Sequence, residues 1–200
     1  MKIIVVGTTG TLGKAIVAEL GSRHEIVRAG REGADVKVDI TNLDSLKAMY
    51  AQVGTIDAVI CAAGNVHFGA LTDITPEQYA IGLNDKLMGQ VNLVLAGQHV
   101  INDGGSFTLI SGVLSDDPIR WGSSASMVNA AIDAFVHAAP LNSLAEYAST
   151  ASARRSLPSR WINTARSFAA SSQWQLPMRR LHLRRVRKAH KPGKHTPSYN

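Results

Sequence analysis

Residues 2–13 read Lys2-Ile-Ile-Val-Val-Gly-Thr-Thr-Gly-Thr-Leu-Gly13, and this stretch decides the fold. The run Lys2–Val6 predicts a strand buried on both faces, and three glycines at intervals of three follow it. Apolar side chains at helical spacing come next, so the loop joins a strand to a helix. Such a loop allows a close approach of the backbone to a pyrophosphate, which the helix N-terminus then faces. We therefore predict a dinucleotide site formed by Gly7, Thr8, Thr9, Gly10, Thr11, Leu12 and Gly13.

Strand and helix patterns continue to alternate as far as residue 139. The apolar patterns predict further strands at 24–28, 35–40, 56–62 and 106–110, and helices at 41–53, 81–100 and 124–139. Thr75-Pro76-Glu77 predicts a further helix start, with proline at the first helical position. This alternation is typical of right-handed βαβ units. We expect an α/β fold with a doubly wound parallel sheet, Rossmann-like and of three αβα layers.

The charge divides the chain in two. Residues 1–140 hold 9 Lys and Arg against 14 Asp and Glu, whereas residues 141–200 hold 12 Lys and Arg and a single acid, Glu146. Pro140 ends the last helical pattern, and no hydrophobic period follows it. We therefore expect a dinucleotide-binding domain at 1–139 and a basic, irregular tail at 140–200, whose arginine clusters could contact nucleic acid phosphates.

The composition excludes several classes of protein. Apolar residues make up 45% of the chain, but no apolar run reaches the length of a membrane helix, and the first residues do not resemble a secretory signal. The single cysteine, Cys61, excludes an internal disulfide, and the histidines show no metal-ligand spacing. We expect a cytoplasmic protein with no metal site and no membrane partner.

The residues after the second strand indicate which dinucleotide binds. No acid, which would bind the ribose of NAD, occurs there before Glu32, whereas Arg28 and Arg31 could hold a 2′-phosphate. This favours NADP over NAD. The alternative is that both arginines are ordinary solvated side chains.

Several motifs, in order, resemble those of the short-chain dehydrogenase/reductase family. Besides the glycine loop, these are Asp39-Ile40, Cys61-Ala-Ala-Gly64, Lys86-Leu-Met-Gly89, Leu109-Ile-Ser111 and Asn129-Ala-Ala-Ile-Asp-Ala-Phe135. The resemblance covers residues 1–139. It implies that Asp39 and Ile40 border the adenine, that Ala62, Ala63 and Gly64 line the cofactor, and that Ser111 is catalytic. For Asp39-Ile40, a plain surface turn is the alternative.

The chain departs from the family at the catalytic pair. Alignment of the motifs puts Ala125 at the position of the family's tyrosine, Asn129 at that of its lysine and Lys86 at that of its asparagine. This indicates an atypical branch, in which Lys86 faces Ser111 and the cofactor, Ser124 or Ser126 supplies a hydroxyl, and substrate or water carries the proton. The alternative is that Lys86 is solvated and Ser111 caps a strand end.

The tail resembles a frame-shifted product. Leu141–Arg155 back-translates, in a second frame, into Glu-Leu-Pro-Arg-Gly-Ile-Arg-Ile-Asn-Cys-Val-Ser-Pro-Thr, which is similar to the family's sixth strand. Arg166–Phe168 and Lys194–Tyr199 back-translate in the same way. We therefore expect the sheet to be incomplete at its C-terminal strands.

The resemblance implies an oxidoreductase that transfers hydride between NADP(H) and a carbonyl or alcohol substrate. Loss of the family's tyrosine and lysine could impair its catalysis. The resemblance also implies a dimer or tetramer formed through the long helices. Two alternatives stay open. One is a sensor that binds the dinucleotide without turnover, and the other is nucleic-acid binding through the tail.

Overall fold

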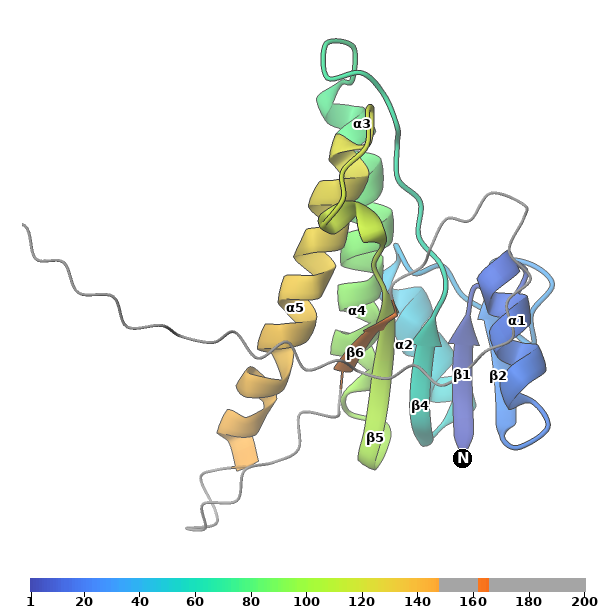
Figure 1. Ribbon diagram of the computed structural model, residues 1–200. Coiled ribbons are helices and arrows are strands. Elements are labelled where there is room, and N and C mark those ends of the chain that lie inside the picture. Colours follow the sequence, from blue (N-terminus) through green and yellow to red (C-terminus); the bar gives the residue numbers. More distant parts are fainter. Residues whose placement is uncertain (148–161, 166–200) are drawn as a thin grey trace, which may run out of the picture. The chain divides into compact units, whose positions relative to one another are not determined.

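Six parallel strands form one sheet. The structure, a computed structural model, describes residues 1–147 and 162–165, with side chains placed for residues 1–139. The strands are β1 (Lys2–Val6), β2 (Glu25–Gly30), β3 (Val36–Lys37), β4 (Ile56–Cys61), β5 (Ile101–Ile110) and β6 (Ile162–Ala165). Their order is β3-β2-β1-β4-β5-β6, and every pair is parallel (Figure 1). The order reverses between β1 and β4, as in dinucleotide-binding folds, and the predicted fold class is confirmed.

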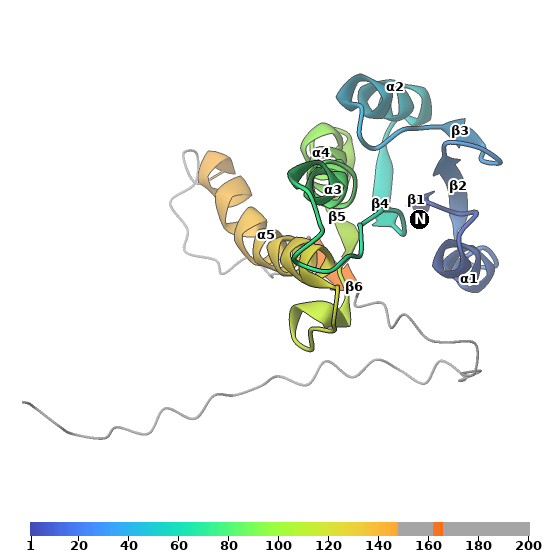
Figure 2. The same cartoon turned by 90° about the horizontal axis from the view of Figure 1, so that it is seen from above.

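Helices lie on both faces of the sheet. They are α1 (Thr11–Leu20), α2 (Leu43–Val53), α3 (Pro76–Ile81), α4 (Met88–Gly97) and α5 (Ser123–Tyr147), with a π-helical turn η1 (Gly82–Leu87) and a 3-10 turn η2 (Val113–Ser115). The larger core packs α2, α4 and α5 against one face through Leu46, Leu93 and Ile132. On the other face, Val17 and Leu20 of α1 pack against a smaller core (Figure 2). After Lys2, the run at β1 is apolar because successive residues point to opposite faces of the sheet and enter the two cores in turn.

Local sequence signals position two helix starts. The Asn42 side chain accepts hydrogen bonds from the backbone N–H groups of Asp44 and Ser45 at 2.9 and 3.1 Å. At α3, Thr75 and Gln78 form a reciprocal capping box, and Pro76 occupies the first turn. These pairings satisfy N–H groups that a helix leaves unbonded.

The segment predicted as one long helix at 81–100 begins earlier and changes pitch. It starts at Pro76, passes through the π-helical turn Gly82–Leu87, and ends as α4 at Gly97. The periodicity of the sequence did not reveal the π turn, which inserts one residue into the helical spacing.

Other boundaries also differ from the predictions. The strand expected at 35–40 is only Val36–Lys37, because β3 is an edge strand and the chain turns at Asp39, whose carbonyl oxygen accepts from the Asn42 N–H. Helix α5 does not end at Ala139 but continues through Pro140, since one proline removes a hydrogen bond without forcing the chain out of the helix.

The expected absence of a sixth strand is also wrong. Residues 162–165 pair with β5, from Phe107↔Ile162 to Ile110↔Ala165. A parallel edge is completed by main-chain hydrogen bonds, which depend little on side-chain pattern, so four residues suffice. The predicted boundary at 139/140 stays a prediction, and the rest of the tail lies outside the described residues.

Candidate functional site

The glycine loop turns sharply at the end of β1. Gly7 has φ of +86°, a conformation that favours glycine, and its N–H donates to the Ala29 carbonyl oxygen at 3.0 Å. Gly13, in the first turn of α1, lies directly on the Gly7 backbone: a Cβ there would stand 2.1 Å from the Gly7 oxygen. The first turn of α1 therefore packs directly against the start of the loop, and the helix begins next to the end of β1.

An open cleft of about 800 Å³ lies over this loop, at the carboxyl ends of the strands. This size lies within the range of ligand sites, and the place is the switch point where such folds bind ligands. Most predicted cofactor residues line it. They are Gly7, Thr9, Gly10, Arg31, Asp39, Ile40, Ala62, Ala63 and Gly64.

Other predicted contacts do not line the cleft. Thr8 is buried, and Thr11, Leu12 and Gly13 belong to the first turn of α1, whose backbone N–H groups have no partner within the helix. Sequence reasoning missed several lining residues beyond the motifs: Val6, Gly30, Glu32, Gly33, Val38, Asn65 and Asp85. These residues could have been found from their place in the sequence, because most of them lie at or shortly after the carboxyl end of a parallel strand.

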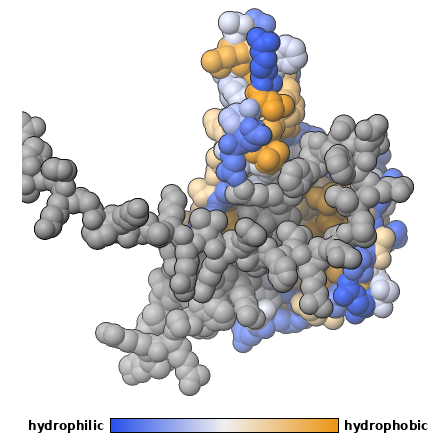
Figure 3. Space-filling model, viewed as in Figure 1, coloured by the Kyte–Doolittle hydropathy of each residue, from blue (hydrophilic) through white to orange (hydrophobic). Residues whose placement is uncertain are grey.

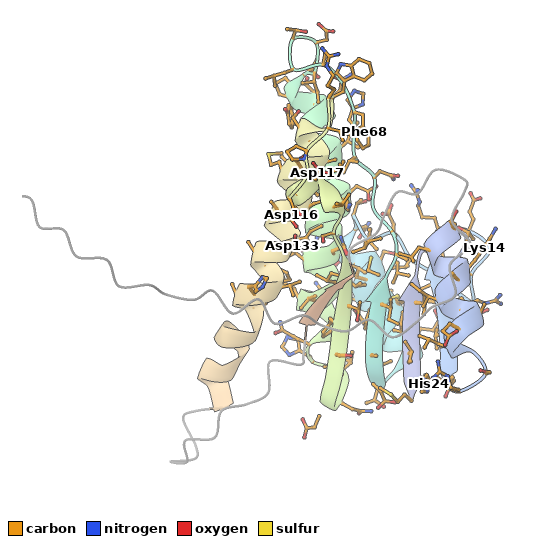
Figure 4. All side chains as sticks on the ribbon, viewed as in Figure 1. Lys14, His24, Phe68, Asp116, Asp117 and Asp133 are labelled. Carbon is orange, nitrogen blue, oxygen red and sulfur yellow. The ribbon has the colours of Figure 1, made fainter. Side chains whose placement is uncertain are left out.

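Arg28 and Arg31, which were expected to hold the 2′-phosphate together, line different cavities. Arg28 forms a bidentate pair with Asp35, at 2.7 and 3.2 Å, and this pair lowers the pKa of the Asp35 carboxyl. Arg28 lines a second hollow of about 340 Å³ together with Lys14, whereas Arg31 lines the large cleft. Figure 4 shows Lys14 on α1, well away from Asp133 on α5. The structure therefore does not bring Arg28 and Arg31 into one cavity.

Asp39 combines the two interpretations left open by the sequence. Its Oδ1 accepts from the Thr41 N–H and hydroxyl at 2.9 and 2.8 Å, which closes a turn and lowers the pKa of the carboxyl. Asp39 also lines the cleft. Asp39 therefore both closes a turn and forms part of the wall of the cleft.

Lys86, Asn129 and Ser111 meet at the end of β5. Lys86 Nζ donates to Asn129 Oδ1 at 2.6 Å and to the Ser111 carbonyl oxygen at 3.4 Å. Neither Ser111 nor Lys86 is among the residues that line the cleft. The stem of Lys86 lies against Gly64, which does line it: a Cβ on Gly64 would stand 2.6 Å from Lys86 Cγ. Burial lowers the pKa of Lys86, an effect that the Asp133 carboxylate opposes in part. Burial also raises the pKa of the Cys61 thiol to about 12, so this thiol carries no charge at neutral pH.

The hydroxyl groups expected from the next helix lie deeper. Ser124 Oγ is buried at the contact with Gly82, and neither Ser124 nor Ser126 lines the cleft. Ala125 is buried as well. Tyr79 shares a hydrogen bond of 2.7 Å with Ser123 Oγ, at the start of α5.

Within the described residues, no group of three His, Cys, Asp or Glu side chains could hold a metal ion. No helix among them has both the length and the apolar character to cross a membrane.

Comparison with known proteins defines the class of the chain. The model of the NAD dependent epimerase/dehydratase family matches residues 3–101. A small-chain dehydrogenase in complex with NADPH is 26% identical, with a TM-score of 0.65, over 70% of this chain and 64% of that one. A further small-chain dehydrogenase is 25% identical, with a TM-score of 0.64, over 70% of this chain and 76% of that one. The fold is thus that of NAD(P)-dependent oxidoreductases.

The protein lin1944 from Listeria innocua is more similar still. It is 43% identical, with a TM-score of 0.71, over 83% of this chain and 76% of that one. The chain therefore belongs to the same family as lin1944, and its structural neighbours include small-chain dehydrogenases. No curated protein matches it.

Proposed function

We propose that the protein is an NADP(H)-dependent oxidoreductase that acts on a carbonyl or alcohol substrate. The observation that carries this proposal is the cleft of about 800 Å³ over the glycine loop, lined by the ends of β1, β2 and β4. The NADPH complex of a similar dehydrogenase supports a nicotinamide dinucleotide as the cofactor.

The cleft fits such a cofactor along its length. Gly7, Thr9 and Gly10 leave room for a pyrophosphate, which the first turn of α1 attracts through its N–H groups. Asp39 and Ile40 border the adenine end, and Ala62, Ala63 and Gly64 lie where the chain leaves β4. When bound, the nicotinamide supplies a hydride to a carbonyl carbon or accepts one from an alcohol.

Arg31 supports NADP over NAD. Its side chain lines the cleft and, among the described residues, forms no ion pair within 4.0 Å, so its guanidinium can meet a 2′-phosphate. Titration with NADPH and NADH tests this preference. Arg31→Ala should weaken NADPH binding about tenfold or more and leave NADH binding unchanged. Arg23→Ala, at an exposed arginine in the turn after α1, is the matched control. Equal affinity of the wild-type protein for both nucleotides would refute the preference.

Ser111 and Lys86 are the proposed catalytic residues. Ser111 is buried at the end of β5, where its Oγ forms no hydrogen bond with any described residue, and Lys86 contacts the same strand end. Consumption of NADPH across a panel of aldehydes and ketones tests turnover. Binding of NADPH without consumption would favour the sensor instead, a possibility that Ala125 at the tyrosine position supports.

An exposed apolar stripe supports a homo-oligomer. Ile81, Met88 and Leu95 recur every seven residues along α3, η1 and α4, and each is more than 40% exposed. Figure 3 shows apolar side chains gathered on the projecting part of the helical layer. Leu95→Glu should convert a dimer or tetramer into monomers in sedimentation or light scattering, and a monomeric wild type would refute the proposal.

The atypical branch and the frame-shifted tail are proposals from the sequence. The back-translation of Leu141–Arg155 supports the second, and gene sequencing tests it: a stop codon in the alternative frame over this stretch would end the idea. The same test bears on nucleic-acid binding, the weaker alternative, which requires the basic tail to be a genuine product. A cytoplasmic location is proposed from the lone cysteine, Cys61, which fits a reducing compartment.

A further inference from the structure

Lys86 occupies an unusual backbone setting. It lies in the π-helical turn Gly82–Leu87, between two α-helical segments of one continuous helix. π turns are rare and occur frequently at functional sites. This turn holds the stem of Lys86 against Gly64, while Asp85 of the same turn accepts from the N–H and side chain of Asn65 at 3.1 and 2.9 Å. The turn is thereby tied to the wall of the cleft.

The bonded partners of the Lys86 ammonium are both neutral. An ammonium group has three N–H bonds, and the amide oxygen of Asn129 and the carbonyl oxygen of Ser111 accept two of them. The third N–H has no acceptor among the described residues. Beside it, the buried Ser111 hydroxyl also lacks a hydrogen-bond partner. The Lys86 N–H and the Ser111 hydroxyl thus lie at one strand end without partners among the described residues. A substrate oxygen placed there would form hydrogen bonds with both.

The charged groups around Lys86 are few. Asp133 of α5 is one turn beyond Asn129 and accepts from Ser115 Oγ at 3.2 Å. The Asp85 carboxylate accepts a hydrogen bond from the Asn65 side chain, and the Cys61 thiol of β4 keeps its proton at neutral pH. Burial therefore outweighs the attraction of the carboxylates, and the neutral amine of Lys86 becomes accessible nearer to neutral pH than that of a free lysine.

We propose that Lys86 is the proton donor and acceptor of the reaction and that Asn129 is the residue that positions it. This proposal rests on the proposed oxidoreductase function and deepens it. It replaces the expectation that substrate or water carries the proton.

The proton transfer balances as follows for reduction of a carbonyl. As the carbonyl carbon gains two electrons with the hydride, its oxygen takes a proton from Lys86. One O–H bond forms and one N–H bond of Nζ breaks, and the electron pair of that bond stays on the nitrogen as a neutral amine. The amine regains a proton from solvent water. In the oxidation of an alcohol the same atoms exchange the proton in the opposite direction.

Asn129 can act in this scheme only through Lys86. Asn129 is buried, and its Oδ1 accepts a hydrogen bond from Lys86 Nζ at 2.6 Å. A carboxylate at this position would stabilise the ammonium and raise the pKa of Lys86, whereas leucine would remove the acceptor. Asn129→Asp and Asn129→Leu therefore separate positioning of the amine from simple packing.

The test combines a titration, a binding measurement and a turnover measurement on the full chain. The lysines are labelled by reductive methylation with ¹³C-formaldehyde, and NMR follows the titration of each one, with Lys86 assigned from its loss in Lys86→Met. NADPH binding is measured by fluorescence, and NADPH consumption by absorbance with 4-nitrobenzaldehyde and 9,10-phenanthrenequinone from pH 5 to 10. Lys47→Met, at an exposed lysine of α2, is the matched control.

The expected results are specific. Lys86 titrates below the ordinary lysine range, and Asn129→Asp moves both this titration and the alkaline limb of the reduction rate upward by about one pH unit. Lys86→Met lowers turnover about 100-fold or more while NADPH affinity stays within about threefold of wild type. Lys47→Met changes none of these.

Three outcomes would overturn the inference. They are a Lys86 titration within the ordinary lysine range, a pH profile that Asn129→Asp leaves in place, and NADPH binding by wild type with turnover unaffected by Lys86→Met. Absence of NADPH binding by the wild type refutes the proposed function itself. The NMR titration still reports on Lys86 in that case, so the two failures are distinguishable.

Discussion

Alanine substitutions at Gly13 and Gly10 separate the structural role of the glycine loop from its role in binding. At Gly13, an added Cβ would stand 2.1 Å from the Gly7 oxygen and 2.8 Å from Thr8 Cα. Both are backbone atoms, so no side-chain rotation relieves the contact. At Gly10, φ is −76° and the nearest atom to a Cβ is the Gly7 oxygen at 3.5 Å, an ordinary contact distance. The protein alone therefore tolerates alanine at Gly10 but not at Gly13.

The stability changes follow from these distances. Overpacking against backbone costs about 3 kcal/mol or more, so Gly13→Ala should lower the Tm by roughly 6–12 °C in a chain of this size. For Gly10→Ala, the reduced freedom of the unfolded chain and the poorer helix cap nearly cancel, so the free energy of unfolding stays within about 1 kcal/mol of wild type.

The binding change has the opposite pattern. Because Gly10 lines the cleft, its methyl group takes up space that the pyrophosphate needs, and NADPH affinity should fall about tenfold or more. Thermal melts monitored by circular dichroism and fluorescence titration with NADPH measure the two effects separately. Wild-type affinity in a well-folded Gly10→Ala protein would refute the placement of the cofactor.

Three further changes address the core, a helix start and the buried lysine. Tyr50→Phe removes the hydrogen bond of 2.8 Å from a buried hydroxyl to the Leu93 carbonyl oxygen and should cost about 1 kcal/mol in urea unfolding; an unchanged midpoint would contradict the contact. Asn42→Ala removes the cap of α2 and should also cost about 1 kcal/mol, with NADPH affinity unchanged in a titration, whereas Asn42→Ser should restore most of the stability. Lys86→Met should change the pH dependence of stability. Since the pKa of Lys86 is lower in the folded state, the unfolded state binds more protons between that pKa and about 10.4, and wild-type stability rises with pH across this window. Urea melts at pH 7 and pH 10 should show this rise in wild type and less of it in Lys86→Met, and parallel curves would contradict a buried ammonium.

Much of the fold could be predicted because its signals are local. The apolar run at Lys2–Val6, the glycines at 7, 10 and 13, and the cap at Thr75-Pro76 each act within a few residues. The π turn at Gly82–Leu87 and the strand at Ile162–Ala165 could not be predicted in this way. The first is a change of helical pitch that the residue pattern tolerates, and the second is stabilised by main-chain bonds to β5.

The candidate site divides along the same line. By itself, the sequence determined that a strand, a glycine turn and a helix would build a dinucleotide cleft, because each of these depends on the backbone freedom and side-chain size of consecutive residues. Only the tertiary structure decided that Arg28 pairs with Asp35 while Arg31 lines the cleft, and that Lys86 is bonded to Asn129, 43 positions away. These contacts depend on how strands and helices pack, and packing brings together side chains whose distance along the chain carries no information about their distance in space.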